Sequence, residues 1–300
     1  MSLALSTVIL PYQRWEGGGR AAWTRAEELG LHAAYTYDHL SWRTFRDGPW
    51  FAAMPTLTAA AGVTERIRLG TLVTNPNFRH PVTLAKDLIS LDDVSGGRIT
   101  LGIGAGTTGF DAAVLGQHAW SARERADRFA EFVALLDRLL TEPDVTSTGT
   151  FYSAYESRNL PGCVQQPRLP FAIAATGPRG LALAAAYGQA WVTTGDDKLF
   201  ADGTPAESDA AIAGQVRRLE EACATIDRDP AGVRRILLTG FTPEANGPLQ
   251  SFERFVDFAG RHRDLGFDEI VVHWPIPDSD FAAPYDVFEQ IATQAMAQLG

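Results

Sequence analysis

Apolar positions along this chain follow two patterns, short continuous runs and longer stripes with a helical period. Both occur in the stretch 66–106. Ile67–Val73 is a short apolar run typical of a strand, leucines then recur at helical spacing, and Arg98–Ile103 is a second short run. Two strands joined by one helix through short turns predict a parallel βαβ unit. In such units ligands bind at the carboxyl ends of the strands.

The same alternation continues over the rest of the chain. Helical patterns separate eight predicted strands, which lie at Leu3–Leu10, Ala33–Tyr37, Ile67–Val73, Arg98–Ile103, Phe171–Ala175, Ala190–Thr194, Ile236–Phe241 and Glu269–His273. Alternating strands and helices without a break in composition predict one (β/α)₈ TIM barrel formed by residues 1–300. A doubly wound open sheet is the alternative.

One segment interrupts the alternation. Residues 107–170 hold a strong helical pattern at 122–140 and then a long stretch with no helical period. We expect this segment to be an insertion between strands four and five, with a small hairpin around Thr148–Tyr155. Such an insertion accounts for a chain longer than the ~250 residues typical of the barrel.

Composition narrows the classes of partner. The formal net charge is −10, and there is no run of Lys or Arg of the kind that a phosphate backbone requires. No apolar run approaches the ~20 residues of a membrane span. Cys163 and Cys223 lie far apart, and the N-terminus lacks the pattern of a signal peptide. We therefore expect a cytoplasmic protein that acts on a small molecule, without nucleic acid or membrane as partner.

A first candidate site follows the buried strand Phe171–Ala175. Thr176, Gly177, Pro178 and Arg179 lead directly into a helix. Free N–H groups and the helix dipole favour an anion at a helix N-terminus, and Arg179 adds a guanidinium. The four residues fit either an ordinary strand-to-helix turn or a phosphate site. The closely spaced glycines that end at Gly106 lack the dinucleotide-binding spacing and indicate close approach of a flat ligand.

A second candidate site lies where the second strand ends. Asp38 and His39 stand there, and histidine is the side chain most able to exchange a proton near neutral pH. Asp38 could orient His39 or bind a ring nitrogen of a cofactor. Aromatic residues at strand ends, among them Tyr12 and Trp42, suit a flat apolar ligand, and His273 ends the last strand. No spacing typical of a metal site occurs.

The residues of the βαβ unit also carry a family resemblance. The segment IRLGTLVTNPNFRHPVTLAKDLISLDDVSGGRITLGIGAG resembles the signature of the bacterial luciferase-like monooxygenase superfamily. That superfamily holds FMN-dependent monooxygenases and oxidoreductases that use the deazaflavin coenzyme F420. The resemblance implies a barrel with an insertion and a homodimer. It also implies a non-proline cis peptide at Val73–Thr74, against which the cofactor ring would lie next to Asn75.

The resemblance also implies roles for individual residues. Gly177, Pro178 and Arg179 match the family segment that holds the cofactor phosphate, and Tyr37-Asp38-His39-Leu40 is more similar to the deazaflavin members. Trp42 would wall the substrate side. Sugar-phosphate dehydrogenases of the group carry an acid where this chain has Thr107, and the nearest acid here is Asp111. This departure argues against glucose 6-phosphate as the substrate.

Together these observations predict hydride transfer between F420 and a small organic substrate, with His39 as general acid or base. Two alternatives stay open. One is an FMN-dependent monooxygenase that activates oxygen, and the other is a family member that binds flavin without chemistry. The long loops that would select the substrate carry no readable pattern.

Overall fold

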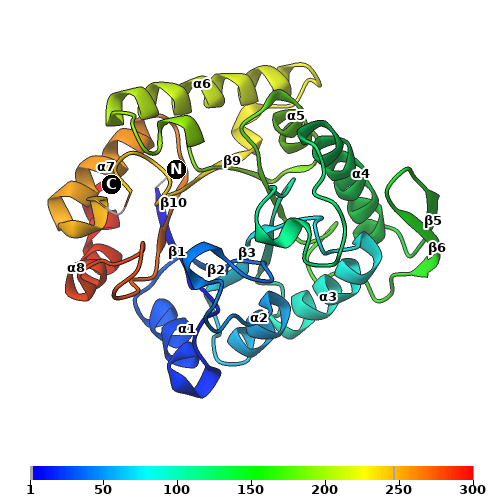
Figure 1. Ribbon diagram of the computed structural model, residues 1–300, viewed down its shortest axis with the longest axis horizontal. Coiled ribbons are helices and arrows are strands. Elements are labelled where there is room, and N and C mark those ends of the chain that lie inside the picture. Colours follow the sequence, from blue (N-terminus) through cyan, green and yellow to red (C-terminus); the bar gives the residue numbers. More distant parts are fainter. Residues whose placement is uncertain (1–2, 246, 300) are drawn as a thin grey trace.

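The computed structural model describes residues 3–245 and 247–299. Its centre is a closed barrel of eight parallel strands in the order β1-β10-β9-β8-β7-β4-β3-β2 (Figure 1). The predicted (β/α)₈ barrel is therefore confirmed. The strands are β1 Ala4–Val8, β2 Ala33–Thr36, β3 Arg68–Thr74, β4 Ile99–Gly104, β7 Phe171–Ala174, β8 Ala190–Thr193, β9 Arg234–Leu238 and β10 Glu269–His273.

Helices form a ring around the barrel (Figure 1). They are α1 Gly19–Glu28, α2 Ala53–Ala61, α3 Pro81–Val94, α4 Ala122–Thr141, α5 Pro178–Tyr187, α6 Pro205–Ala224, α7 Phe252–Asp264, α8 Tyr285–Gln290 and α9 Met296–Leu299, the last two joined by the π turn Ile291–Ala295. Pro81, Pro178 and Pro205 occupy first turns, where a missing N–H costs no hydrogen bond.

Two apolar layers hold the barrel together. One fills its interior and includes Val8, Leu72, Ile236 and Val271. The other lies between the strands and the helices, where the leucine stripe of α3 is buried as its spacing predicts. Among the described residues, no helix is both long and apolar enough to cross a membrane.

The expected insertion at 107–170 is only partly an insertion. Its helix α4 packs between α3 and α5 and so is the barrel's own helix between β4 and β7. The additional parts are the loop 107–121 and the segment after α4. That segment contains the antiparallel hairpin β5 Asp144–Thr148 with β6 Ser153–Arg158, which confirms the hairpin expected around Thr148–Tyr155 (Figure 1).

Candidate active site

A cavity of about 1150 Å³ lies at the carboxyl ends of the barrel strands. We call it the mouth cavity. Segments that follow β2, β3, β4, β7, β8 and β9 line it, in the place where barrels of this kind bind ligands. Ten residues that the sequence singled out line this cavity, namely His39, Trp42, Val73, Asn75, Gly106, Thr107, Thr176, Gly177, Pro178 and Arg179.

The end of β2 shows how side-chain alternation divides these candidates. Tyr37 and His39 line the mouth cavity, whereas Asp38 between them does not, because successive side chains of an extended strand point to opposite sides. Asp38 is 1% exposed. Its carboxylate accepts hydrogen bonds from Arg79 Nη2 (2.6 Å), Arg79 Nε (3.0 Å) and Thr74 Oγ1 (2.9 Å). The expected contact between Asp38 and His39 is therefore replaced by an ion pair behind the barrel wall.

The end of β3 repeats this alternation. Val73 and Asn75 line the mouth cavity, whereas Thr74 is fully buried and does not. A non-proline cis peptide is present, but it joins Leu72 to Val73. The cis bond expected at Val73–Thr74 thus lies one residue earlier. Val73 still faces the cavity, as a residue against which a flat ring could lie.

His39 has a different carboxylate partner, Asp111. Asp111 belongs to the 3-10 turn Phe110–Ala112 in the loop after β4, and it is 3% exposed. One of its oxygens contacts His39 Nδ1. The other accepts hydrogen bonds from the backbone N–H groups of Leu40 (3.0 Å) and Ser41 (3.3 Å).

This arrangement sets the protonation pattern of the imidazole. The Asp111 carboxylate accepts a hydrogen bond from Nδ1, so neutral His39 carries its hydrogen on Nδ1 and leaves Nε2 as an acceptor. Trp50 Nε1 also donates to the His39 carbonyl oxygen (2.8 Å), which fixes the backbone. Because His39 lines the mouth cavity, its imidazole is within reach of a ligand bound there.

The opposite side of the mouth cavity holds the predicted anion site. Gly177 is the N-cap of α5, and Pro178 is its first residue. Open space surrounds the position of a Cβ on Gly177, so a ligand can approach this backbone. Arg179 is half exposed, and its guanidinium pairs with Asp127 of α4. A phosphate bound here would share Arg179 with that carboxylate.

Gly106, two residues after β4, lines the mouth cavity. Its φ of +75° lies in the left-handed region, and a Cβ there would be 2.8 Å from Asn77 Oδ1. Asn77 in turn donates to the Thr107 carbonyl oxygen (3.2 Å) and accepts from Arg128 (2.7 Å). The absence of a side chain on Gly106 therefore lets this network reach the cavity wall.

His273 does not line the mouth cavity, although a site role was expected. It is fully buried, and it stacks on Phe281 with ring centroids 3.9 Å apart. Its Nε2 lies 2.7 Å from the hydroxyl oxygen of Tyr37. His273 therefore contacts a side chain that lines the cavity without lining the cavity itself. Burial lowers the pKa of His273 to about 3, which keeps the ring neutral.

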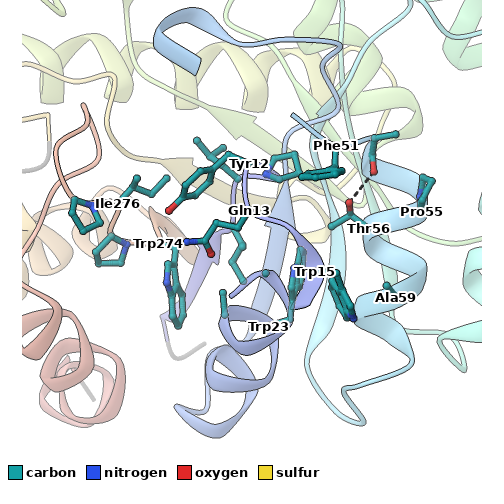
Figure 2. Close-up of a pocket in the computed structure, with 18 of the residues that line it drawn as sticks. Tyr12, Gln13, Trp15, Trp23, Phe51, Pro55, Thr56, Ala59, Trp274 and Ile276 are labelled. Carbon is teal, nitrogen blue, oxygen red and sulfur yellow. Dashed lines mark hydrogen bonds between the residues drawn. The ribbon is translucent and has the colours of Figure 1, made fainter. Parts of the chain in front are cut away.

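Tyr12 also lies outside the mouth cavity. It lines a separate side pocket of about 680 Å³, formed by the segments after β1 and β10 and by α1 and α2 (Figure 2). Figure 2 shows Tyr12 beside Ile276 in this pocket, with Trp15 and Phe51 farther along its wall. Tyr12 therefore lies away from the cavity that most other candidates line, and its place in the substrate pocket stays a prediction.

Sequence reasoning missed other residues of the mouth cavity. Phe241 and Leu238 close it from β9, and Arg43 lies over the rings of Trp42 (4.7 Å) and Phe241 (5.3 Å). Asp111 was noticed only as the nearest acid to Thr107. The strand end marks Leu238 and Phe241, but no local pattern marks Asp111, because it reaches His39 through a loop without periodicity.

The fold and the cavity define a (β/α)₈ enzyme with a large cavity over the carboxyl ends of its strands. A family model described as luciferase-like monooxygenase matches residues 19–246. The chain belongs to this family.

Relatives of known name share part or most of the chain. An F420-dependent glucose-6-phosphate dehydrogenase of Beutenbergia cavernae is 37% identical over 56% of this chain, and the chain spans half the length of that relative. The protein of the same name from Intrasporangium calvum is 34% identical over 85% of this chain and 87% of its own. The coenzyme F420 dependent tetrahydromethanopterin reductase from Methanopyrus kandleri has the same fold, with a TM-score of 0.76, 17% identity and full coverage of both chains.

Proposed function

We propose that this chain is an oxidoreductase that transfers a hydride between coenzyme F420 and a small organic substrate. The observation that carries the proposal is the His39–Asp111 pair at the mouth cavity, opposite the open N-terminus of α5. Relatives that match most of the chain are named F420-dependent dehydrogenases, which supports the choice of cofactor.

The mouth cavity fits a flat ring system with a phosphate-bearing tail. Val73, Asn75 and Gly106 offer a flat wall of backbone and small side chains, and Gly177 and Arg179 offer donors for a phosphate. When bound, F420 supplies a deazaflavin ring that accepts or donates a hydride. Asp38 does not line the cavity. We propose that its hydrogen bonds with Arg79 and Thr74 hold the end of β3 in place at the edge of the cofactor ring.

His39 would move the proton that accompanies the hydride. Its Nε2 accepts the hydroxyl proton of an alcohol substrate, or returns one to a carbonyl oxygen in the reverse direction. Asp111 stabilises the imidazolium that forms and keeps the ring in this orientation. Trp42, whose ring lies 4.7 Å from that of His39, would place the substrate against the imidazole.

Side-by-side titration of the purified protein with F420 and FMN, followed by ligand fluorescence, tests the cofactor. We expect tight binding of F420 and weak binding of FMN. Tight FMN binding with oxygen consumption would replace the proposal by a flavin monooxygenase. Binding of F420 with no effect of His39→Ala on any turnover would indicate a binding protein without chemistry.

Two finer expectations belong to the same proposal. We infer that the protein is cytoplasmic and forms a homodimer, as the family resemblance implies. Light scattering coupled to size-exclusion chromatography should give a mass of twice 32.5 kDa. A mass equal to one chain across micromolar concentrations would contradict the homodimer.

A further inference from the structure

Few positive charges face the substrate side of the mouth cavity. Among its described lining residues the arginines are Arg43 and Arg179, and there is no lysine. Arg179 lies at α5, on the side proposed for the cofactor phosphate. The lining also holds two carboxylates, Asp111 and Asp197. A phosphate dianion on the substrate side would therefore meet a single cation, and recognition of phosphate relies on several charged donors.

That cation is itself engaged with aromatic rings. Arg43 lies over Trp42 and Phe241, and its neighbour Arg46 lies over Phe110, 4.5 Å from the ring centroid. Guanidinium groups stacked in this way extend an apolar surface and fix the positions of the rings. The loop after β2 therefore shapes aromatic walls.

The walls around His39 are apolar. Tyr37 and Trp42 meet edge to face with centroids 5.0 Å apart, and Leu238, Phe241 and Val192 continue the surface on the facing strands. These residues pack with the apolar interior of the barrel. A substrate carbon held beside His39 would thus meet mainly aromatic and aliphatic side chains, apart from Asp111 and Arg43.

Exposed apolar side chains also stand at the edge of the mouth cavity, which we call its rim. Phe110 lines the cavity and is 41% exposed, and the ring of Phe200, which is 39% exposed, lies 6.4 Å from that of the lining residue Phe241. Exposed apolar side chains at the opening of a cavity indicate a surface that an apolar ligand covers.

We propose that the substrate of this site is a neutral, lipophilic alcohol or the corresponding carbonyl compound, and that the site does not accept a sugar phosphate. The inference rests on the proposed function. In the oxidative direction the carbinol carbon loses a hydride to the oxidised deazaflavin, the hydroxyl proton passes to His39 Nε2, and a carbonyl double bond forms. The relatives named glucose-6-phosphate dehydrogenases would differ from this chain in the substrate half of the site.

The test is the F420-loaded enzyme with a series of 2-alkanols from 2-butanol to 2-octanol, compared with glucose 6-phosphate. Each added methylene that enters the apolar walls should raise kcat/KM by about fourfold. Glucose 6-phosphate at millimolar concentration should give no turnover above background. Turnover of glucose 6-phosphate, or a flat response to chain length, would overturn the proposal.

F420 binding is titrated separately on the same preparation. Failure to bind F420 would remove the proposed function and this inference with it. Normal binding of F420 with no turnover of any alkanol or its ketone would overturn the substrate class alone.

A matched pair of variants locates the effect. Phe110 lines the mouth cavity and is 41% exposed, whereas Phe51 lines the side pocket and is 39% exposed. Phe110→Ala should lower kcat/KM for 2-octanol roughly tenfold more than it lowers kcat/KM for 2-butanol. Phe51→Ala should change neither value, and an equal loss in both variants would contradict a lipophilic rim.

Discussion

At the scale of single residues, the pairing of His39 with Asp111 determines what the site can do. The imidazole lines the mouth cavity, and its Nδ1 contacts a buried carboxylate. The sequence correctly places His39 at the strand end, but it suggests the adjacent Asp38 as the carboxylate partner of the imidazole. Alternation along β2 sends Asp38 to Arg79 instead, and the role of Asp38 near the cofactor remains a prediction.

Replacing Asp111 tests the pairing. Asp111→Asn removes the negative charge that stabilises the imidazolium and offers an N–H that favours the wrong tautomer. We expect kcat to fall by about 10–100-fold. Stopped-flow measurement of F420 reduction checks the rate.

A double-mutant cycle separates this effect from misfolding. In a His39→Asn background, Asp111→Asn should lower the residual rate little further, because the two side chains act as one unit. Additive losses in the cycle would show that Asp111 acts independently of His39.

His273 gives a prediction for the dependence of stability on pH. Its pKa is about 3 in the folded chain and near the ordinary 6.5 when unfolded, because burial disfavours the charged ring. The unfolded state therefore binds an extra proton below pH 6.5, and the native state loses about 1.4 kcal/mol of stability per pH unit between there and pH 3. Above pH 6.5 this contribution is fully present.

Denaturant unfolding of the native chain and of His273→Gln at pH 7 and pH 5 measures this linkage. The native chain should lose about 2 kcal/mol more than the variant over this interval. Equal losses would mean that His273 titrates normally in the folded protein.

At the scale of elements, the N-terminus of α5 is the part of the site best suited to bind a phosphate. Its backbone donors are open, and Arg179 stands beside them in an ion pair with Asp127 of α4. The sequence Thr176–Arg179 predicted this element, because glycine and proline at these positions are typical of a strand-to-helix turn. Asp127 was not predicted, because its contact with Arg179 depends on how α4 and α5 pack.

The pairing makes two substitutions informative. Arg179→Ala should weaken F420 affinity by about 1–3 kcal/mol, since a charge-assisted hydrogen bond to phosphate is lost. Asp127→Ala should leave the affinity unchanged or improve it, because Arg179 then has no competing carboxylate. Isothermal titration calorimetry measures both, and a loss in Asp127→Ala equal to that in Arg179→Ala would exclude a phosphate contact by Arg179.

At the scale of the whole molecule, the sequence predicted the barrel correctly. It predicted only in part which side chains face the mouth cavity. Buried parallel strands read as apolar runs, so the barrel followed from pattern alone. Helix α4 was assigned to an insertion, because local sequence does not show whether a helix closes the ring. Tyr12 and His273 stand at strand ends but miss the mouth cavity, since a turn at Pro11 and packing on Phe281 redirect them.

The carboxylate of Asp111 has one more consequence, in the exchange of backbone protons with solvent. It bonds two backbone N–H groups of the segment after β2 from the loop after β4, so neither segment can open without the other. The amides of Leu40 and Ser41 should exchange with deuterium at the rate at which loop 107–121 opens. Asp111→Asn should increase the exchange rates of the Leu40 and Ser41 amides to a similar degree. The same substitution would then lower the catalytic rate and loosen the two segments.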